Sequence, residues 1–319
     1  MKKGLLLSLA LLVLTTAYSQ RAARRSVIKI SLIPEPVSMV RPVDFGRLPL
    51  NANTRILYAG SEEIARLTNQ FASRFAAVTG YPIKAMPGKA AITGSIFFSL
   101  KDDPSIKEEG YRLTVNAKGV VLHARKPAGL FYGIQTLLQL FPPAIELKKE
   151  GEPTEWEIPF VSIEDYPRFG WRGLMLDVSR HFFTVAQVKD YIDQMVKYKF
   201  NLLHLHLTDD QGWRLQIKSL PKLTEVGAWR VERTGTFGTL SKPQPGEKAS
   251  YGGFYTHEDI KELVKYASDR FVNILPEIDV PGHSLAAIAA YPELSCTPGE
   301  YYVSPGDRFM IWPGGGQHF

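Results

Sequence analysis

Charged residues and one histidine follow three apolar runs in the second half of the sequence. The set comprises Asp177, Arg180, Asp209, Asp210, Glu277, Asp279 and His283. Carboxylates and imidazole transfer protons near neutral pH, and an arginine donates several hydrogen bonds to hydroxyl groups. Because a carboxylate orients and charges a neighbouring imidazole, Asp209 beside a histidine is a candidate proton-transfer pair. The set predicts acid–base chemistry on a hydroxyl-rich substrate such as a sugar.

Several of these residue types also have a purely structural interpretation. Arg180 and one aspartate are able to form an ion pair beneath the loops, and His283, after Pro-Gly, to be a satisfied turn residue. Trp213 offers an aromatic face suited to a sugar ring, although a tryptophan is more often part of a core. His204 and His206 point the same way on a strand, where buried barrel residues are expected.

A metal-dependent hydrolase is the alternative that the two histidines keep open. His204 and His206, together with Asp209 and His283, offer ligand types that bind zinc on a barrel strand. The histidines lie in the middle of the strand, however, and no lysine or further histidine follows at a matching strand end. A metal site is therefore the weaker expectation.

Buried strands alternate with amphipathic helices after Pro167. The strands are expected at residues 172–178, 201–207 and 271–278, and the two helices begin at the caps Thr184 and Thr256. This alternation predicts a parallel sheet with right-handed crossovers.

Two α/β architectures fit that alternation. In a (β/α)8 TIM barrel, functional side chains gather where the strands end, and all three expected strands here end in polar residues. A doubly wound sheet also fits the alternation. The polar residues at all three strand ends favour the barrel.

The first half of the chain is built differently and reads as a small α+β domain. A helix is expected at residues 61–78, a strand at 92–100, a hairpin from 111–115 and 120–124, and a second helix from Pro127. None of these elements carries a cluster of chemically active residues. The expected role of this domain is structural support.

The beginning of the chain has the pattern of a secretory signal peptide. Residues 1–19 combine two lysines, a short apolar run and a small-residue exit, and the run is short for a membrane span. We expect an exported protein, periplasmic or secreted, with no membrane anchor. The domains are then expected at residues 20–166 and 167–319. Cys296 is the only cysteine, so no internal disulfide is possible.

The charge balance excludes an obvious nucleic-acid surface. The net charge is +6, and without Lys2 and Lys3 the chain has 36 basic and 32 acidic residues, or +4. No basic stripe is interleaved with aromatic residues, as nucleic-acid binding would require. A neutral substrate fits this balance.

Three long motifs resemble the first three barrel strands of the family 20 β-N-acetylhexosaminidases, which are glycoside hydrolases. They are Trp171-Arg-Gly-Leu-Met-Leu-Asp177-Val-Ser-Arg180-His181, Leu203-His-Leu-His-Leu-Thr-Asp209-Asp210-Gln-Gly-Trp213-Arg and Pro276-Glu-Ile-Asp279-Val-Pro-Gly-His283. Upstream, Ile33-Pro-Glu-Pro36 and residues 110–141 resemble that family's N-terminal α+β domain.

The resemblance implies an exo-acting hydrolase of terminal β-linked N-acetylglucosamine or N-acetylgalactosamine, with an N-acetylhexosamine-containing oligosaccharide or glycoconjugate as substrate. Catalysis would be substrate-assisted and retaining, with the 2-acetamido oxygen as nucleophile and without a metal or organic cofactor. Arg180 matches the residue that holds hydroxyls of the terminal sugar. Asp209 and His283 match the pair beside the general acid Glu. Asp177, Asp210 and Glu277 are expected only to support these residues.

The resemblance also implies that a catalytic Asp-Glu pair follows the fourth strand, in a Gly-Gly-Asp-Glu motif. No Asp-Glu dipeptide occurs after Pro167, and only about three of eight strands are expected. We therefore expect this chain to be an inactive fragment of an active parent enzyme, with an open sheet edge and an uncovered apolar face. The non-enzymatic alternative is a secreted carbohydrate-binding remnant.

Overall fold

The computed structural model describes residues 30–43, 45–147, 149–151, 153–233 and 240–305. The chain divides into two compact units, Met1–Tyr166 and Pro167–Phe319. The expected signal peptide lies outside the described residues. Among those described, no helix is both long enough and apolar enough to cross a membrane.

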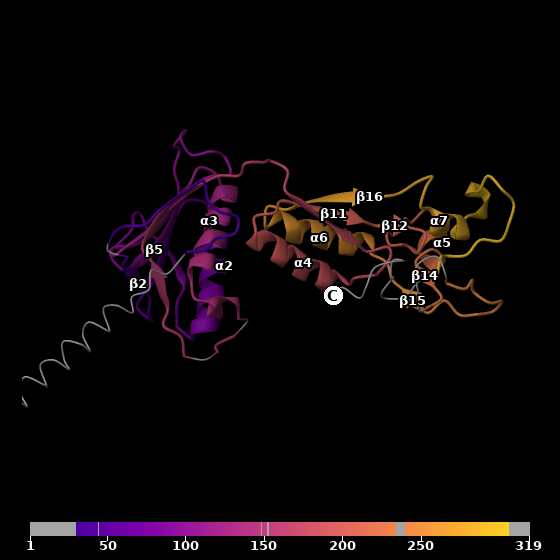
Figure 1. The fold of residues 1–319 in the computed structure, drawn as a ribbon, viewed down its shortest axis with the longest axis horizontal. Coiled ribbons are helices and arrows are strands. Elements are labelled where there is room, and N and C mark those ends of the chain that lie inside the picture. The colour runs from indigo at the N-terminus through magenta and orange to yellow at the C-terminus, as the bar shows by residue number, and fades with distance from the viewer. Residues whose placement is uncertain (1–29, 44, 148, 152, 234–239, 306–319) are drawn as a thin grey trace, which may run out of the picture. The chain divides into compact units, whose positions relative to one another are not determined.

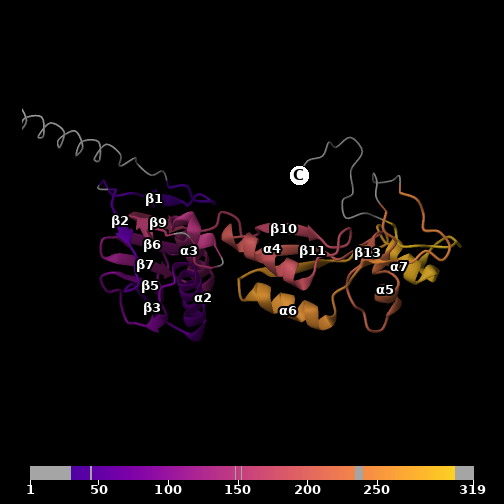
Figure 2. The same ribbon diagram turned by 90° about the horizontal axis from the view of Figure 1, so that it is seen from below.

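The first unit is a mixed sheet with helices packed against it. Its seven strands lie in the order β1-β9-β6-β7-β5-β3-β4, which can be followed in Figure 2 from β1 to β3. The strands are β1 (Ser38–Val40), β3 (Arg55–Ala59), β4 (Ala85–Pro87), β5 (Ser95–Leu100), β6 (Tyr111–Asn116), β7 (Gly119–Ala124) and β9 (Val161–Asp165). A separate pair joins β2 (Arg47–Pro49) to β8 (Glu157–Pro159).

Helix α2 (Glu62–Thr79) shows why this unit folds as it does. Its predicted apolar positions are all buried: Ile64, Leu67, Phe71, Phe75 and Val78. Gly80 ends the helix in the left-handed conformation, with φ of 69°, which glycine adopts without strain. Helix α3 (Pro127–Leu140) packs against β6 and β7, and a short 3-10 turn, η1 (Pro143–Glu146), follows it.

The β6–β7 pair is the predicted antiparallel hairpin, with Asn116 opposite Gly119. The alternation did not predict the parallel pairs of this unit. Strand β3 pairs in parallel with both β4 and β5, and β5 pairs in parallel with β7. Helix α2 connects β3 to β4, so this segment is a βαβ crossover. Its second strand, β4, is short and mostly exposed, so the sequence pattern did not reveal it.

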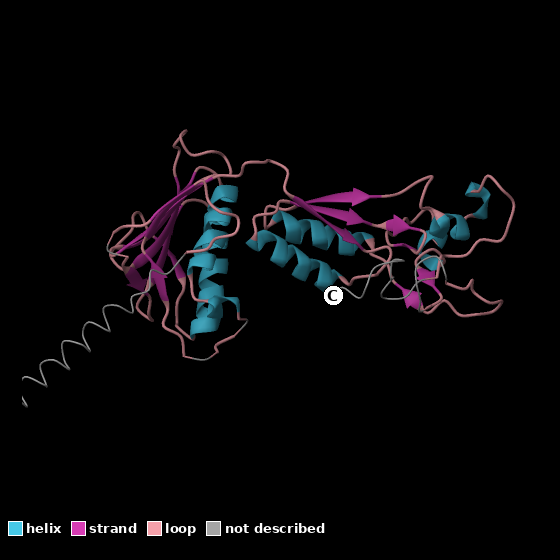
Figure 3. Cartoon of the chain, in the orientation of Figure 1, coloured by secondary structure: helices cyan, strands magenta, loops and turns pink. Residues whose placement is uncertain are grey.

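The second unit contains a parallel sheet of three strands, β10 (Gly173–Asp177), β11 (Leu202–His206) and β16 (Asn273–Glu277). Helices α4 (Val185–Lys197) and α6 (His257–Ser268) connect them and lie on the same face of the sheet, as Figures 1 and 3 show. Helices on one face are what a barrel wall has, whereas a doubly wound sheet carries helices on both faces.

Both connecting helices begin where the sequence predicted. Thr184 accepts a hydrogen bond from the Gln187 amide, and Thr256 accepts one from the Asp259 amide. In each case the third helical residue reaches back to the cap, which completes a capping box.

The register of the sheet aligns side chains in rows across the three strands. Met175, His204 and Leu275 form one row, and Asp177, His206 and Glu277 form the row at the carboxyl end. Met175 and Leu275 are exposed on the face opposite the helices. In the described part of the chain, β10 and β16 each pair only with β11.

Shorter elements follow the strands on the carboxyl side. They are β12 (Thr208–Asp209), β13 (Gly212–Trp213), α5 (Lys222–Glu225), β14 (Trp229–Arg230), β15 (Tyr251–Gly252), α7 (Leu285–Ala290) and η2 (Pro292–Leu294). Strands β12 and β13 form one small antiparallel pair, and β14 and β15 form another.

Candidate active site

The three strands bring their terminal polar residues together at one edge of the sheet. Asp177 ends β10, His206 ends β11 and Glu277 ends β16, and the register places them side by side. Asp209 and Arg180 follow two of these strands within three residues. The structure therefore gathers the predicted cluster from segments up to 100 residues apart in the chain, because parallel strands end at the same edge.

Arg180 is held by three side chains and is still partly exposed to solvent. Its Nη1 lies 2.9 Å from Asp177 Oδ2, its Nη2 lies 2.6 Å from Asp209 Oδ2, and its Nε donates to Gln211 Oε1 at 3.1 Å. The side chain nevertheless keeps 35% of its surface exposed. The ion pair and an accessible guanidinium therefore occur together, so the structural interpretation and a binding role are compatible.

Asp209 is the buried centre of the cluster, with no exposed side-chain surface. Its Oδ2 accepts from Arg180 and from His206 Nε2 at 3.0 Å, and its Oδ1 faces His283 Nδ1 at 3.2 Å. Burial favours the neutral carboxyl, but the hydrogen bonds from His206 and the Asp210 amide, with the charge of Arg180, outweigh it. The pKa of Asp209 is consequently lowered, and its carboxylate stays ionised.

His283 joins the cluster from the loop after β16. Its side chain is 59% exposed, and its backbone is left-handed, with φ of 49°. A residue other than glycine is strained in that region, and such strain persists only where surrounding structure holds it. One ring nitrogen faces Asp209 at 3.2 Å while most of the ring is accessible.

His206 also belongs to the cluster, although the sequence indicated only a buried barrel residue. It is buried, and its Nδ1 lies 2.8 Å from Glu277 Oε2 while its Nε2 faces Asp209. The hydrogen bond to Asp209, against the opposing effect of burial and with help from Glu277, raises the pKa of His206 to about 9. Two carboxylate acceptors require a proton on each ring nitrogen, so the ring is an imidazolium.

Arg180 Nη1 also lies 3.0 Å from His206 Nε2. A neutral imidazole would be able to accept a hydrogen bond from the guanidinium at this contact. That tautomer would place a nitrogen lone pair against Asp209 Oδ2 at 3.0 Å. Because Arg180 Nη1 already has Asp177 as its acceptor, the protonated ring satisfies more groups.

Glu277 extends the network to His204, whose Nε2 lies 2.5 Å from the same Oε2 atom. Burial alone would raise the pKa of Glu277, but the two histidines outweigh it and lower that pKa. His204 is only partly buried, in contrast to the buried position that was expected. The strand period placed both histidines on one face, but it did not identify the carboxylate that they share.

Asp210 and Asp279 each take part in a hydrogen bond that involves a main-chain amide. Asp210 Oδ1 accepts from the Leu285 amide at the start of α7, and the Asp279 amide donates to Thr208 Oγ1 at 2.9 Å. Asp210 therefore anchors the segment that follows His283.

Trp213 is a core residue, as its residue type favoured, and it is not the sugar platform that was the alternative. It is 7% exposed and its Nε1 donates to Leu215 O at 2.6 Å. The ring packs in a cluster with Leu223, Ala286, Ala287, Ala290 and Val303. Its face is therefore covered by apolar side chains.

The four residues of the metal hypothesis do not form a single group. Two sets of possible ligand atoms lie close together in the described chain, one from His206, Glu277 and Asp279 and the other from Asp209, Asp210 and His283. His204 belongs to neither. Both nitrogens of His206 already face carboxylates, which suits a hydrogen-bonded imidazolium better than a metal ligand, because a ligand nitrogen must be deprotonated.

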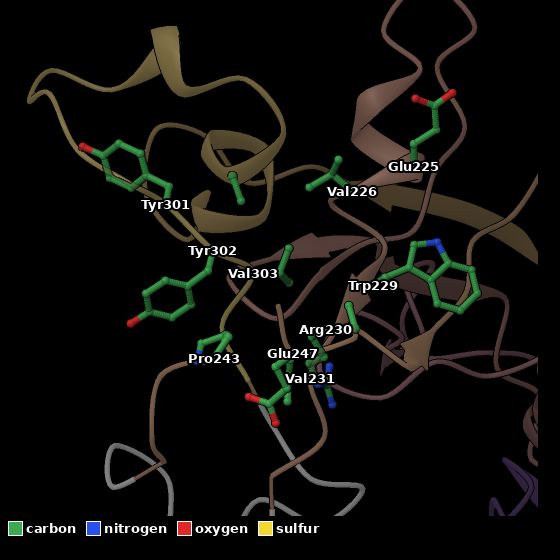
Figure 4. Close-up of a pocket in the computed structure, with 12 residues that line it drawn as sticks. Glu225, Val226, Trp229, Arg230, Val231, Pro243, Glu247, Tyr301, Tyr302 and Val303 are labelled. Carbon is green, nitrogen blue, oxygen red and sulfur yellow. The ribbon is translucent and has the colours of Figure 1, made fainter. Parts of the chain in front are cut away.

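A pocket of about 530 Å³ lies near this cluster but does not include Arg180, Asp209 or His283. Figure 4 shows Val226, Val231, Val303 and Arg230 among its lining residues. Arg230 also donates to the backbone oxygen of Arg180 at 2.8 Å, so it is shared between the pocket wall and the segment that carries Arg180.

Comparison with known proteins matches both units to one family. Residues 29–166 match the model for glycosyl hydrolase family 20, domain 2, and residues 169–310 match the model for the catalytic domain of that family. The β-hexosaminidase of Porphyromonas gingivalis is 39% identical over 85% of this chain and 33% of its own length. The β-N-acetylhexosaminidase of Cellulomonas fimi is 35% identical over 83% of this chain and 49% of its own length.

Solved structures give the same result. The family 20 β-N-acetylhexosaminidase of Streptomyces coelicolor A3(2) superposes with a TM-score of 0.74 at 39% identity, covering 85% of this chain and 51% of that one. A mutant Streptomyces plicatus β-hexosaminidase in complex with product, GlcNAc, gives 0.74 at 40% identity, covering 85% and 50%. The chain thus spans a third to a half of the length of these relatives. With an N-terminal domain followed by an α/β domain of the TIM-barrel type, the chain belongs to glycosyl hydrolase family 20.

Proposed function

We propose that the gene product carrying this chain is an exo-acting β-N-acetylhexosaminidase, and that this chain supplies one wall of its sugar site. The observation that carries the proposal is the cluster at the strand ends. An accessible arginine, a buried ionised aspartate and an exposed histidine meet there within hydrogen-bonding distance.

Arg180 is the residue proposed to bind the terminal sugar. Its guanidinium is oriented by Asp177, Asp209 and Gln211 and still has exposed surface, so it can donate to hydroxyl groups on the non-reducing side. Because its partners already fix its position, little side-chain entropy is lost when a sugar binds.

Asp209 and His283 are the residues proposed to support proton transfer. In the substrate-assisted reaction, the 2-acetamido oxygen attacks the anomeric carbon while a general acid protonates the departing oxygen, and water later opens the oxazolinium ring. The buried Asp209 carboxylate holds the His283 ring, most of which stays exposed. We infer that the exposed side of the ring lies beside that acid. The resemblance assigns the acid and the acetamido-orienting residue to an Asp-Glu pair, and this sequence has no such dipeptide after Pro167.

The names of relatives support the substrate class. They include β-hexosaminidases and the N,N'-diacetylchitobiase of Vibrio harveyi, which is 39% identical over 58% of this chain. We infer that the substrate is an oligosaccharide or glycoconjugate with a terminal N-acetylhexosamine. We infer further that β10, β11 and β16 are the first three strands of a (β/α)8 barrel, and that the apolar pattern of residues 1–19 directs export to the periplasm or outside the cell.

The proposal is tested by hydrolysis of 4-nitrophenyl N-acetyl-β-D-glucosaminide by the full-length gene product. We expect nitrophenol release from this substrate and none from the β-D-glucoside, which lacks the acetamido nucleophile. Asp209→Asn should lower kcat/KM by about 100-fold, the effect of losing a proton-transfer partner. Equal hydrolysis of the two substrates would contradict the proposal.

The matched control is Asp193→Asn. Asp193 also binds an arginine, Arg270, but it does so between α4 and α6, away from the strand ends. This variant should retain wild-type kcat/KM. The 319-residue chain alone should release no nitrophenol, and measurable release by it would overturn the assignment of the general acid to an Asp-Glu pair.

A further inference from the structure

Arg214 is a fully buried arginine whose hydrogen-bond acceptors in the described chain are all backbone carbonyl groups. Its Nε donates to Val178 O at 3.0 Å, and its Nη1 donates to Ala228 O at 2.6 Å and Gly253 O at 3.1 Å. Its Nη2 donates to Ser179 O at 2.7 Å and to Gln211 O at 3.4 Å. A guanidinium has five N–H groups, so each has an acceptor.

These acceptors belong to two segments of the candidate sugar site, the turn before Arg180 and the turn at Gln211. Val178 and Ser179 directly precede Arg180, and Gln211 provides the side-chain oxygen that accepts from Arg180 Nε. Arg214 therefore joins the turn that carries Arg180 to the turn that carries its partner.

Arg230 is a second buried arginine that donates to main-chain carbonyl groups, and one of its acceptors belongs to Arg180 itself. Its Nη2 donates to Arg180 O at 2.8 Å and its Nη1 donates to Gln211 O at 3.0 Å. Its guanidinium lies over the Tyr251 ring, 4.5 Å from the ring centroid. Two buried guanidinium groups thus hold the main chain at residues 178–180 and at Gln211.

The sequence around Arg214 is shaped to admit the guanidinium. A Cβ atom at Gly212 would lie 2.3 Å from Arg214 Cζ, a distance that no side chain tolerates. Gly253, which offers one of the carbonyl groups, has φ of 156° and lies against the Phe182 ring. A buried charge without a carboxylate partner is unfavourable in a core that needs only packing, so its presence calls for a role in fixing these loops.

We propose that Arg214 and Arg230 are positioning residues that set the placement of Arg180 for sugar binding. Neither needs to touch the substrate. Arg214 holds the main chain at Val178 and Ser179, just before Arg180, and Arg230 holds it at Arg180 and Gln211. This inference rests on the proposed function, in which Arg180 binds the terminal sugar. Lysine cannot replace either residue, because one ammonium group donates from a single point and cannot reach carbonyl groups on separate segments.

The test is a double-mutant cycle in the full-length gene product, with kcat and KM measured on 4-nitrophenyl N-acetyl-β-D-glucosaminide. The variants are Arg214→Lys, Arg180→Lys and their combination. Residues that act through one another show strongly non-additive effects. We expect Arg214→Lys to lower kcat/KM by about 10-fold or more in the wild-type background and by less than about 3-fold in the Arg180→Lys background.

A role limited to stability predicts a different result, in which Arg214→Lys lowers kcat/KM by the same factor in both backgrounds. That result would overturn the inference. Arg214→Lys should also divide its effect between kcat and KM in the same proportion as Arg180→Lys does. Arg230→Lys is the second variant, and it keeps the test decisive where the loss of five donors prevents Arg214→Lys from folding.

Arg172→Lys is the matched control. Arg172 also donates to main-chain oxygens, those of Phe169 and Lys199, but it does so at the amino end of the sheet. This variant should leave kcat/KM unchanged. The two proposals fail in different ways. An inactive wild-type protein, or a fully active Arg180→Lys variant, refutes the proposed function. Additive effects of Arg214→Lys and Arg180→Lys on kcat/KM in an active protein refute only the positioning role.

Discussion

The pH at which His206 loses its proton is the most informative electrostatic property of the cluster. The ring lies between Asp209 and Glu277, and these contacts raise its pKa from 6.5 to about 9. A histidine with no such partners would be mostly neutral at pH 7.5, whereas this one should be almost entirely charged.

The size of the effect follows from linkage. Each unit of pKa corresponds to about 1.4 kcal/mol, so the rise for His206 is worth on the order of 3 kcal/mol of unfolding free energy. Because the folded pKa lies above the unfolded value, this stabilisation is fully present below pH 6.5. It is lost as the pH rises through about 9, where the folded protein also releases the proton.

Two measurements check this prediction. Histidine-selective NMR titration of the full-length protein should show one ring, absent in His206→Gln, that titrates near pH 9. Denaturant unfolding from about pH 6 to pH 10 should lose about 3 kcal/mol more in wild type than in His206→Gln. The control His257→Gln, which removes a ring whose Nε2 contacts Gln216 O, should keep the wild-type slope. A His206 midpoint near 6.5, or equal slopes for wild type and His206→Gln, would refute the reasoning.

Three further predictions concern the scaffold. Gly129→Ala should destabilise the first unit by about 1–3 kcal/mol in denaturant unfolding, because the added Cβ would lie 2.2 Å from Gly110 O. An unchanged unfolding midpoint would count against this packing. Thr256→Ala should cost about 1 kcal/mol through loss of the α6 cap, and Thr256→Ser should restore most of it. Burial, with the charge of Lys101, lowers the pKa of His123 to about 4, so stability should fall as the pH drops from 6.5 through 4. His123→Gln should flatten that acid slope, and an identical slope would show that His123 is not responsible.

The second unit could be predicted from local patterns to within about two residues at its strand ends. Apolar-rich runs at 172–178, 201–207 and 271–278 predict parallel strands, and the structure has them. The expected burial of the first and third strands is wrong, because Met175 and Leu275 are exposed. Thr184 and Thr256 determine where two helices begin, because a capping box is entirely local. Asp177 and Glu277 then lie at the same edge of the sheet, one on each side of His206, because the three strands are parallel.

The contacts that decide the site chemistry are not local, which is why the sequence did not reveal them. His206 and Glu277 lie 71 residues apart, and their pairing depends on the register of β11 against β16. Arg214 draws its acceptors from four segments that no motif links. Trp213 directly follows the loop of the site, yet it turns into the core, and its position in the sequence does not reveal that direction.

The most direct test of the sugar-binding site compares Arg180→Ala with Arg172→Ala in the full-length gene product. Both arginines belong to the same motif, but only Arg180 lies at the carboxyl end of the sheet, beside Asp209. We predict that Arg180→Ala lowers kcat/KM for 4-nitrophenyl N-acetyl-β-D-glucosaminide by about 100-fold or more, because charge-assisted hydrogen bonds to the sugar are lost. Arg172→Ala should change kcat/KM by less than about 3-fold. An Arg180→Ala variant that retains wild-type kcat/KM would contradict the assignment of the sugar site to this cluster.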